Sequence, residues 1–447
     1  MGKRVAVLLF IGVLCMSGIA SGEEASNPAA GAVPAAMAAS KIDTGDTAWM
    51  LISTALVMLM TPGLALFYGG MVRGKNVLGT LMQSFIALSI ISVQWILIGY
   101  SLSFGPDVNG IIGNLDWVGL NGVGLEPNPD YAPTIPHMTF MIYQAMFAVI
   151  TPALITGAFA ERMKFSAYFV FILLWSTIVY DPVAHWVLGT GGWLKKMGAL
   201  DFAGGIVVHL ISGIAALAAA LIIGRRKGYL QDAMYPHNLP MTVLGTGLLW
   251  FGWFGFNAGS ALSAGTLSTV AFVTTHTSAV SATLMWVVIE WIHRGKPTMF
   301  GAATGSIAGL ATITPASGFV SPMSSLMIGL AAGSLCYLSL NMKGKIGYDD
   351  SLDAFGVHGI GGIIGTVATG LFAQTLINPA GANGLFFGSS QLLSTQMTAI
   401  LVTGAYSFIV TAILLIVIDK VIGLRVDEES EVNGLDISQH GESGYTF

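Results

Sequence analysis

The stretch DFAGGIVVHLISG, residues 201–213, places Asp201 eight residues before His209 in an apolar, glycine-rich run. A second stretch, DSLDAFGVH at 350–358, repeats the same spacing between Asp350 and His358. An ionisable side chain within a membrane-spanning segment is costly and marks a candidate functional site. The two stretches therefore predict a membrane fold and the place of its site.

Composition supports the membrane class. Of the 447 residues, 54% are hydrophobic and 9% are charged, whereas a soluble domain carries roughly a quarter charged residues. Glycine, with 57 residues, is favoured where membrane helices pack closely. No basic block indicates a nucleic-acid partner, and Cys15 and Cys336 offer no disulfide or metal framework. We expect no cofactor and no metal.

Eleven apolar runs have roughly the 20 residues that a helix needs to cross the bilayer. They predict an all-α integral membrane protein with the N-terminus outside and the C-terminus in the cytoplasm. The runs are 47–70, 78–104, 137–160, 166–189, 204–224, 240–259, 268–292, 301–316, 323–340, 351–372 and 396–422.

The basic residues agree with this topology. Thirteen lysines and arginines fall in the loops and tail assigned to the cytoplasm, and only Lys41, Lys195 and Lys196 fall outside in the mature chain. This is the positive-inside bias of membrane proteins. We expect the location to be a bacterial inner membrane.

Both ends of the chain differ from the membrane domain at 46–422. Residues 1–22 have a basic start, a short apolar core and small residues, which predicts a cleaved signal peptide; a retained first helix is the alternative. An extracytoplasmic linker is expected at 23–45. The polar tail at 423–447 is expected in the cytoplasm, where its acidic run 427–431 could dock across the basic loops in weak, exposed contacts.

The repeated Asp and His fall in the fifth and tenth spans. Five spans per half give two halves of opposite orientation, the inverted repeat common in transporters, with His209 and His358 together at a central pore. Burial keeps at least one imidazole neutral, so the pair could donate to and accept from a small molecule. Two unrelated packing histidines are the alternative, and a zinc site is disfavoured because no third His or Cys lies within helical reach.

Other candidate residues are more ambiguous from pattern alone. Asp201 can accept backbone N–H bonds at a helix N-terminus; this structural role is favoured over direct cation coordination, and Asp350 is expected to match it. The aromatic stretch LLWFGWFGFNAGS, 248–260, is either an interfacial belt or a vestibule that binds a small cation over ring faces before Ser260. Phe147 is ambiguous in the same way.

Several motifs together resemble the ammonium transporter (Amt/Mep/Rh) family, in its prokaryotic branch. The resemblance extends from Asp46 to the C-terminus. It rests on PGLALFYGGMVRGKNVL at 62–78, GAFAERMKF at 157–165, DFAGGIVVHLISG at 201–213, WFGWFGFNAGS at 250–260, DDSLDAFGVHGIGG at 349–362 and the tail GLRVDEESEVNGLDISQHGESGY.

The resemblance implies a homotrimer with one pore in each subunit. It implies that His209 and His358 are paired pore histidines and that Phe147 and Phe256 form a stacked gate. It further implies an outer ammonium recruitment site, with Asp201 shaping it, a structural role for Asp350, and a PII-type signal protein as cytoplasmic partner. The recruitment residues that it implies are Phe147, Trp253, Ser260 and Asp201.

Two positions depart from the family pattern. Many members carry Trp at the position of Leu188, and Tyr143 stands where some have Phe. The leucine is expected to widen the cation cage and to weaken recruitment.

We expect ammonium, and methylammonium as an analogue, to be the substrates, with ammonia crossing the hydrophobic pore and the proton released or co-transported. An ammonium sensor is a second hypothesis, which an appended kinase or cyclase domain would favour; the sequence to Phe447 has none. An enzyme is a third, which no nucleophile–base set supports.

Overall fold

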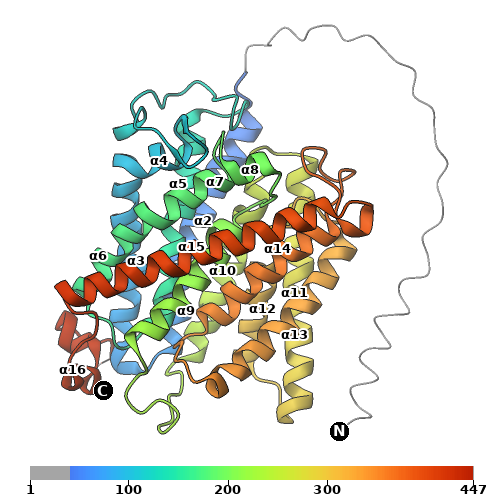
Figure 1. Ribbon diagram of the computed structural model, residues 1–447. Helices are drawn as coiled ribbons and strands as arrows, with labels where there is room; N and C mark the ends of the chain where they lie inside the picture. The colour runs from blue at the N-terminus through green and yellow to red at the C-terminus, as the bar shows by residue number, and fades with distance from the viewer. Residues whose placement is uncertain (1–40, 446–447) are drawn as a thin grey trace, which may run out of the picture. The chain divides into compact units, whose positions relative to one another are not determined.

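Helices account for most of residues 41–445, the part of the chain that the computed structural model describes (Figure 1). Ten helical stretches there are long and apolar enough to cross a membrane, and an eleventh, α12, is shorter at 15 residues. A helix lies at each of the eleven predicted positions, so the prediction of an all-α membrane fold is confirmed. The longer helices are α2 (Thr44–Met71), α3 (Val77–Gln94), α5 (His137–Phe159), α6 (Phe165–Trp175), α9 (Ile211–Ile223), α10 (Leu239–Gly259), α11 (Thr266–Arg294), α12 (Met299–Ile313), α13 (Pro322–Ile346), α14 (Ile360–Phe372) and α15 (Gln391–Val421).

Short elements extend or connect these helices. The π-helical turns are η2 (Trp95–Gly99), η4 (Ser176–Tyr180), η5 (Gly205–Leu210), η6 (Phe355–Gly359) and η8 (Asp436–His440). The other short elements are η1 (Gly74–Asn76), α4 (Tyr100–Phe104), β1 (Asp107–Val108), β2 (Ile112–Gly113), η3 (Val118–Leu120), α7 (Asp181–Val187), α8 (Trp193–Met197), η7 (Leu385–Phe387) and α16 (Glu428–Asn433).

The ends of the predicted segments need small corrections. The Asp43 carboxylate accepts the Asp46 N–H at 2.9 Å and so caps α2, which begins at Thr44, two residues before the predicted start of the membrane domain. Helix α13 continues beyond the predicted end at residue 340 to Ile346. Lys343 and Lys345 in its last turn stabilise this extension, because their positive charges interact favourably with the negative end of the helix dipole. The predicted signal peptide at 1–22 and most of the linker lie outside the described residues.

The fifth and tenth spans cross at two glycines in reciprocal positions. A side-chain carbon at Gly213, four residues after His209, would lie 2.0 Å from the Gly359 nitrogen, one residue after His358. A side-chain carbon at Gly362, four residues after His358, would lie 2.7 Å from the Leu210 nitrogen, one residue after His209. Such a pair of reciprocal contacts is what a two-fold axis between the segments produces.

A loop between α4 and α5 lies at the same end of the helices as α8 (Figure 1). Its β1–β2 hairpin pairs Asp107 with Gly113 and Val108 with Ile112. The Gly110 carbonyl accepts the Trp193 N–H at 3.1 Å and so joins the loop to the start of α8. The loop and α8 together supply part of the wall of the wider cavity described below.

The tail packs on the loops that connect the spans (Figure 1, dark red). The Asp436 carboxylate accepts the Gly79 N–H at 2.8 Å, and the Asn76 amide oxygen accepts the Leu435 N–H at 2.8 Å. Glu431 is buried and accepts the Lys227 N–H at 2.7 Å, whereas Glu428 forms an exposed ion pair with the Lys227 ammonium. The predicted docking therefore occurs within one chain, but its central contact is buried rather than exposed.

Candidate functional site

His209 and His358 meet inside the helical bundle. Their rings, in η5 and η6, lie 5.2 Å apart between centroids with an interplanar angle of 19°. They are 1% and 3% exposed. Among the described residues, neither ring nitrogen of His209 and not the Nδ1 of His358 has a hydrogen-bond partner. Buried polar atoms are rarely left unpaired, so these three nitrogens call for a functional explanation.

A narrow cavity adjoins the two histidines. It offers about 10 Å³ of space to the centre of a water-sized molecule, which is room for about one such molecule. Apart from the imidazoles and the indole of Trp253, its lining is apolar. The lining residues are Met60, Leu64, Phe67, Ile150, Leu154, Val208, His209, Leu249, Trp253, Phe256, Ile307 and His358.

Two phenylalanines lie between this narrow cavity and a wider one. The rings of Phe147 and Phe256 are 4.3 Å apart between centroids and tilted by 39°. Phe256 lines the narrow cavity and Phe147 lines the wide one. Both side chains are buried. The two rings therefore contact each other, one from the lining of each cavity.

The wide cavity offers about 160 Å³ of space to a water-sized centre. Its lining residues are Phe104, Asp130, Tyr131, Phe140, Gln144, Phe147, Leu188, Lys195, Phe202, Ala203, Ser260 and Leu262. The Ser260 hydroxyl donates to the Phe256 carbonyl at 2.8 Å. Because a hydroxyl has a single hydrogen and two lone pairs, Ser260 keeps an acceptor lone pair even where the Tyr143 hydroxyl, 3.2 Å away, donates to it.

Tyr143 contacts the end of α10 and Ser260 without lining the wide cavity itself. Its buried hydroxyl lies 2.9 Å from the carbonyl oxygens of Gly255 and Phe256 and 3.2 Å from the Ser260 Oγ. A phenylalanine could not make these contacts. The departure noted in the sequence therefore fixes the C-terminal turn of α10, which carries Ser260.

Trp253 lies elsewhere than the resemblance implies. Its ring lines the narrow cavity, stacks 5.3 Å from His209, and donates its Nε1 hydrogen to the Thr314 hydroxyl at 3.0 Å. It is absent from the lining of the wide cavity, where Phe147 and Ser260 lie. The structure therefore places Trp253 beside His209, in a different cavity lining from Phe147 and Ser260. The reason is that it precedes Phe256 by nearly one helical turn and lies farther from Ser260 along α10.

Asp201 and Asp350 cap the two histidine segments. The Asp201 carboxylate accepts four backbone N–H bonds, from residues 204 to 207, at 2.6–3.1 Å. The Asp350 carboxylate accepts those of Ala354 and Phe355 at 3.1 and 2.8 Å. Neither carboxylate lines either cavity. Their geometry suits orientation of the histidine turns rather than contact with a cation.

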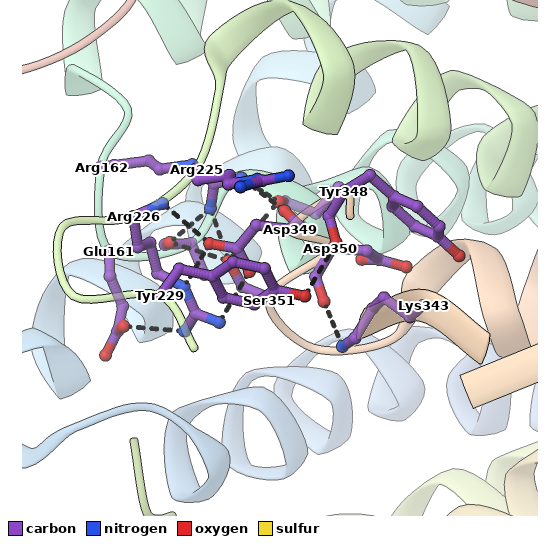
Figure 2. A network of polar contacts seen from close by, with 12 residues as sticks. Glu161, Arg162, Arg225, Arg226, Tyr229, Lys343, Tyr348, Asp349, Asp350 and Ser351 are labelled. Carbon is purple, nitrogen blue, oxygen red and sulfur yellow. Dashed lines mark hydrogen bonds and ion pairs between the residues drawn. The ribbon is translucent and has the colours of Figure 1, made fainter. Parts of the chain in front are cut away.

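A buried ion network supports the Asp350 segment (Figure 2). The Arg226 guanidinium contacts both Asp349 oxygens at 2.8 and 2.9 Å and reaches Glu161 at 3.0 Å. Arg162 donates to the Asp349 carbonyl at 2.6 Å and to the Ser351 hydroxyl at 2.5 Å. Three connecting loops are thereby joined next to Asp350.

The charges of this network fix its protonation. Burial opposes ionisation of Asp349, but the hydrogen bonds and charge of Arg226 and the charge of Arg162 outweigh it and lower the pKa of that carboxyl. Burial likewise opposes ionisation of Glu161, and Arg226 and Arg73 together lower its pKa. Both carboxylates are therefore charged at neutral pH.

Sequence reasoning missed several residues around these cavities. Tyr131, Gln144 and Lys195 line the wide cavity, and Thr314 anchors Trp253. Tyr131 and Lys195 come from a loop and a short helix, which carry no periodic signal. Within residues 41–445, no group of three or more potential metal ligands occurs.

Comparison with known proteins gives a consistent result. The model of the Ammonium Transporter Family matches residues 48–445. The ammonium transporter of Bacillus subtilis is 53% identical over 402 residues, covering 90% of this chain and 98% of that protein. Ammonium transporter Amt1 of Archaeoglobus fulgidus is 51% identical over 402 residues, covering 90% and 99%.

Solved structures agree. Saccharomyces cerevisiae Mep2 superposes with a TM-score of 0.82 at 37% identity, covering 87% of this chain and 89% of that one. A structure described as a sensor Amt protein gives 0.82 at 30% identity, covering 89% and 98%. The family inferred from the motifs is confirmed: the chain belongs to the ammonium transporter family.

Proposed function

We propose that this protein moves ammonium across the membrane by recruiting the cation in the wide cavity, removing a proton, and conducting ammonia past His209 and His358. Family membership supports ammonium transport and a transporter rather than an enzyme. The observation that carries the mechanism is a set of three imidazole nitrogens that have no hydrogen-bond partner within residues 41–445, beside a cavity with room for one small molecule.

The wide cavity has the groups that a small cation needs. The Ser260 lone pairs can accept a hydrogen bond, and the Phe147 ring offers a negative face. At the Phe147–Phe256 pair the cation meets an apolar constriction, where its desolvation is costly. Potassium has the same charge and no proton to lose, so it is rejected there. Ammonium can release a proton and continue as ammonia.

The histidines then replace the solvent for ammonia. A neutral imidazole carries one donor and one acceptor nitrogen, and ammonia can both donate and accept. The released proton either returns to the solution on the side of the wide cavity or crosses along the imidazoles.

We also propose the setting of this activity. The basic loops favour a bacterial inner membrane with the wide cavity outside and the tail in the cytoplasm. Residues 1–22 act as a signal peptide, three copies assemble as a homotrimer, and a PII-type protein binds the cytoplasmic face; the family resemblance supports the last two.

Transport of purified protein in proteoliposomes tests the proposal. Uptake and current are compared for ammonium, methylammonium and potassium at equal concentration. Ammonium-dependent flux without potassium flux supports the proposal, and current per ammonium distinguishes the two proton routes. Equal fluxes for potassium and ammonium, or no flux above empty vesicles, would contradict it.

A sensor is the second candidate, favoured by the similarity to a sensor Amt protein. The same vesicles distinguish it, because a sensor binds ammonium without sustained flux.

A further inference from the structure

Lys195 is a positively charged residue in the wall of a cavity proposed to recruit a cation. The charged side chains in the lining are Asp130 and Lys195. The Lys195 Nζ donates to the Leu188 carbonyl at 2.8 Å and lies 5.8 Å from the centroid of the Tyr131 ring. Its ammonium thus contacts a carbonyl oxygen and faces an aromatic ring.

These partners are the ones that a free ammonium ion would use. The ε-ammonium of lysine is an alkylated ammonium ion with three N–H donors, and a cation over a tyrosine ring is attracted by the ring quadrupole. Lys195 therefore fills, from the protein itself, a position suited to the substrate cation.

Lys195 is an exposed residue, but the groups around its ammonium are fixed by the fold. The Tyr131 hydroxyl donates to the Phe104 carbonyl at 2.7 Å and accepts the Thr190 N–H at 3.0 Å. These two hydrogen bonds hold the tyrosine ring in place. A side-chain carbon at Gly192 would lie 2.0 Å from the His185 carbonyl, so α8 starts in close contact with α7. The lysine thus projects from a fixed support toward Leu188.

The neighbouring Lys196 gives an internal comparison. Both lysines are exposed, but the Lys196 ammonium forms an ion pair with Asp107 at 3.3 Å and is not part of the cavity lining. Lys195 forms no ion pair within 4 Å among the described residues. The nearest relevant carboxylate is that of Asp130, which lines the same cavity and acts on the Lys195 charge without forming an ion pair with it.

We propose that Lys195 is an intramolecular competitor that sets the cation affinity of the wide cavity. Its ammonium group occupies the subsite of the Leu188 carbonyl and the Tyr131 ring, and its charge opposes entry of a second cation. This inference rests on the proposed recruitment of ammonium in the same cavity.

The test compares Lys195→Met, Lys195→Arg and Lys196→Met in proteoliposomes. We expect Lys195→Met to lower the half-saturating concentration of ammonium and methylammonium about three- to tenfold, because a like charge within several ångströms is removed. The effect should shrink when the ionic strength is raised from about 0.02 M to about 0.5 M. Lys195→Arg keeps the charge and should stay near wild type. Lys196→Met removes an equal charge outside the cavity and should leave half-saturation unchanged.

Three outcomes would overturn the inference. An unchanged or higher half-saturation in Lys195→Met means that the lysine only caps the carbonyl end of α7; Lys195→Gln repeats the comparison if the Met variant loses thermal stability. An equal gain in Lys196→Met means a general surface-charge effect. A gain that persists unchanged at high salt excludes charge. Failure of the proposed function is a separate result, since the wild type would then show no ammonium-dependent flux.

Discussion

His209 and His358 bring polar atoms into a cavity that is otherwise mostly apolar. We expect His209→Ala and His358→Ala each to reduce ammonium flux at least tenfold or to admit potassium. Each substitution removes an imidazole that can donate to ammonia or accept from it, and each such hydrogen bond is worth about 1 kcal/mol or more. Flux and potassium current in proteoliposomes measure the effect, and chromatography of the purified variants checks assembly.

His293→Ala is the matched control for both variants. His293 lies at the exposed end of α11, where its Nδ1 contacts the Tyr337 hydroxyl at 2.7 Å, and it lines neither cavity. Normal ammonium flux and normal potassium rejection in both pore variants would remove the histidines from the mechanism.

Leu188 is one of the two positions at which this chain departs from the pattern of the family it resembles, and it lines the wide cavity. Leu188→Trp adds a π-face that attracts a cation by about 0.5–2 kcal/mol. Converted to affinity, this is a half-saturating ammonium concentration that is roughly two- to thirtyfold lower. Leu188→Met, which changes shape without adding a ring, serves as control. If the Trp and Met variants have the same half-saturation, the ring does not contact the recruited cation.

At the scale of elements, Arg226 is the guanidinium that forms ion pairs with both Glu161 and Asp349. Arg226→Met removes a positive charge that offsets the buried carboxylates of Glu161 and Asp349. Breaking a buried ion pair in this way lowers the free energy of unfolding by about 3–5 kcal/mol. We expect a clear loss of thermal stability in detergent. Arg225→Met is the control, because Arg225 makes an exposed bond to the Gly347 carbonyl at 2.8 Å. Equal melting temperatures for the two variants would rule out the network as a stabilising feature.

The same network predicts a dependence on pH. The pKa values of Asp349 and Glu161 are lowered, so their contribution to stability is complete above the ordinary carboxyl pKa of about 4. It is lost as pH falls further, through the lowered values. The stability difference between wild type and Arg226→Met should therefore be constant near neutral pH and shrink below about pH 4.

Hydrophobic length was enough to locate the spans, because each helix must cover the same thickness of hydrocarbon. Hydrophobic length could not show which of the two cavities Trp253 lines, because an aromatic residue fits either one until the rotation of α10 about its axis is known. The loop at 105–136 and α8 were not predicted as part of a cavity wall, because their residues contact the site only through the tertiary fold. The Asp–His spacing was informative because it repeated, which one isolated histidine would not have been.

At the scale of the whole molecule, the tail connects distant loops. Truncation after Arg425 removes the buried Glu431, whose carboxylate contacts Arg425 at 2.7 Å and the Lys227 N–H at 2.7 Å. We expect at least about a twofold loss of flux and weaker inhibition by a PII-type protein, since a buried charged hydrogen bond is worth about 1.5–3 kcal/mol. Both are measured in the same vesicles.

Point variants separate the buried contact from the acidic character of the tail. Glu431→Gln should reproduce part of the loss, while Glu428→Gln removes an exposed ion pair of small value and should change little. Truncated protein with wild-type flux and wild-type partner affinity would leave the tail without a regulatory role.

The reciprocal contacts of Gly213 and Gly362 limit how this protein can move. Two backbones in contact on both sides of an axis leave little space for one half to rock against the other without pulling the contacts apart. Alternating access by such rocking would have to break both contacts in every cycle. We therefore expect passage to need only side-chain motion at Phe147 and Phe256. The transport rate should then be limited by ring motions on the nanosecond timescale rather than by slower domain motions.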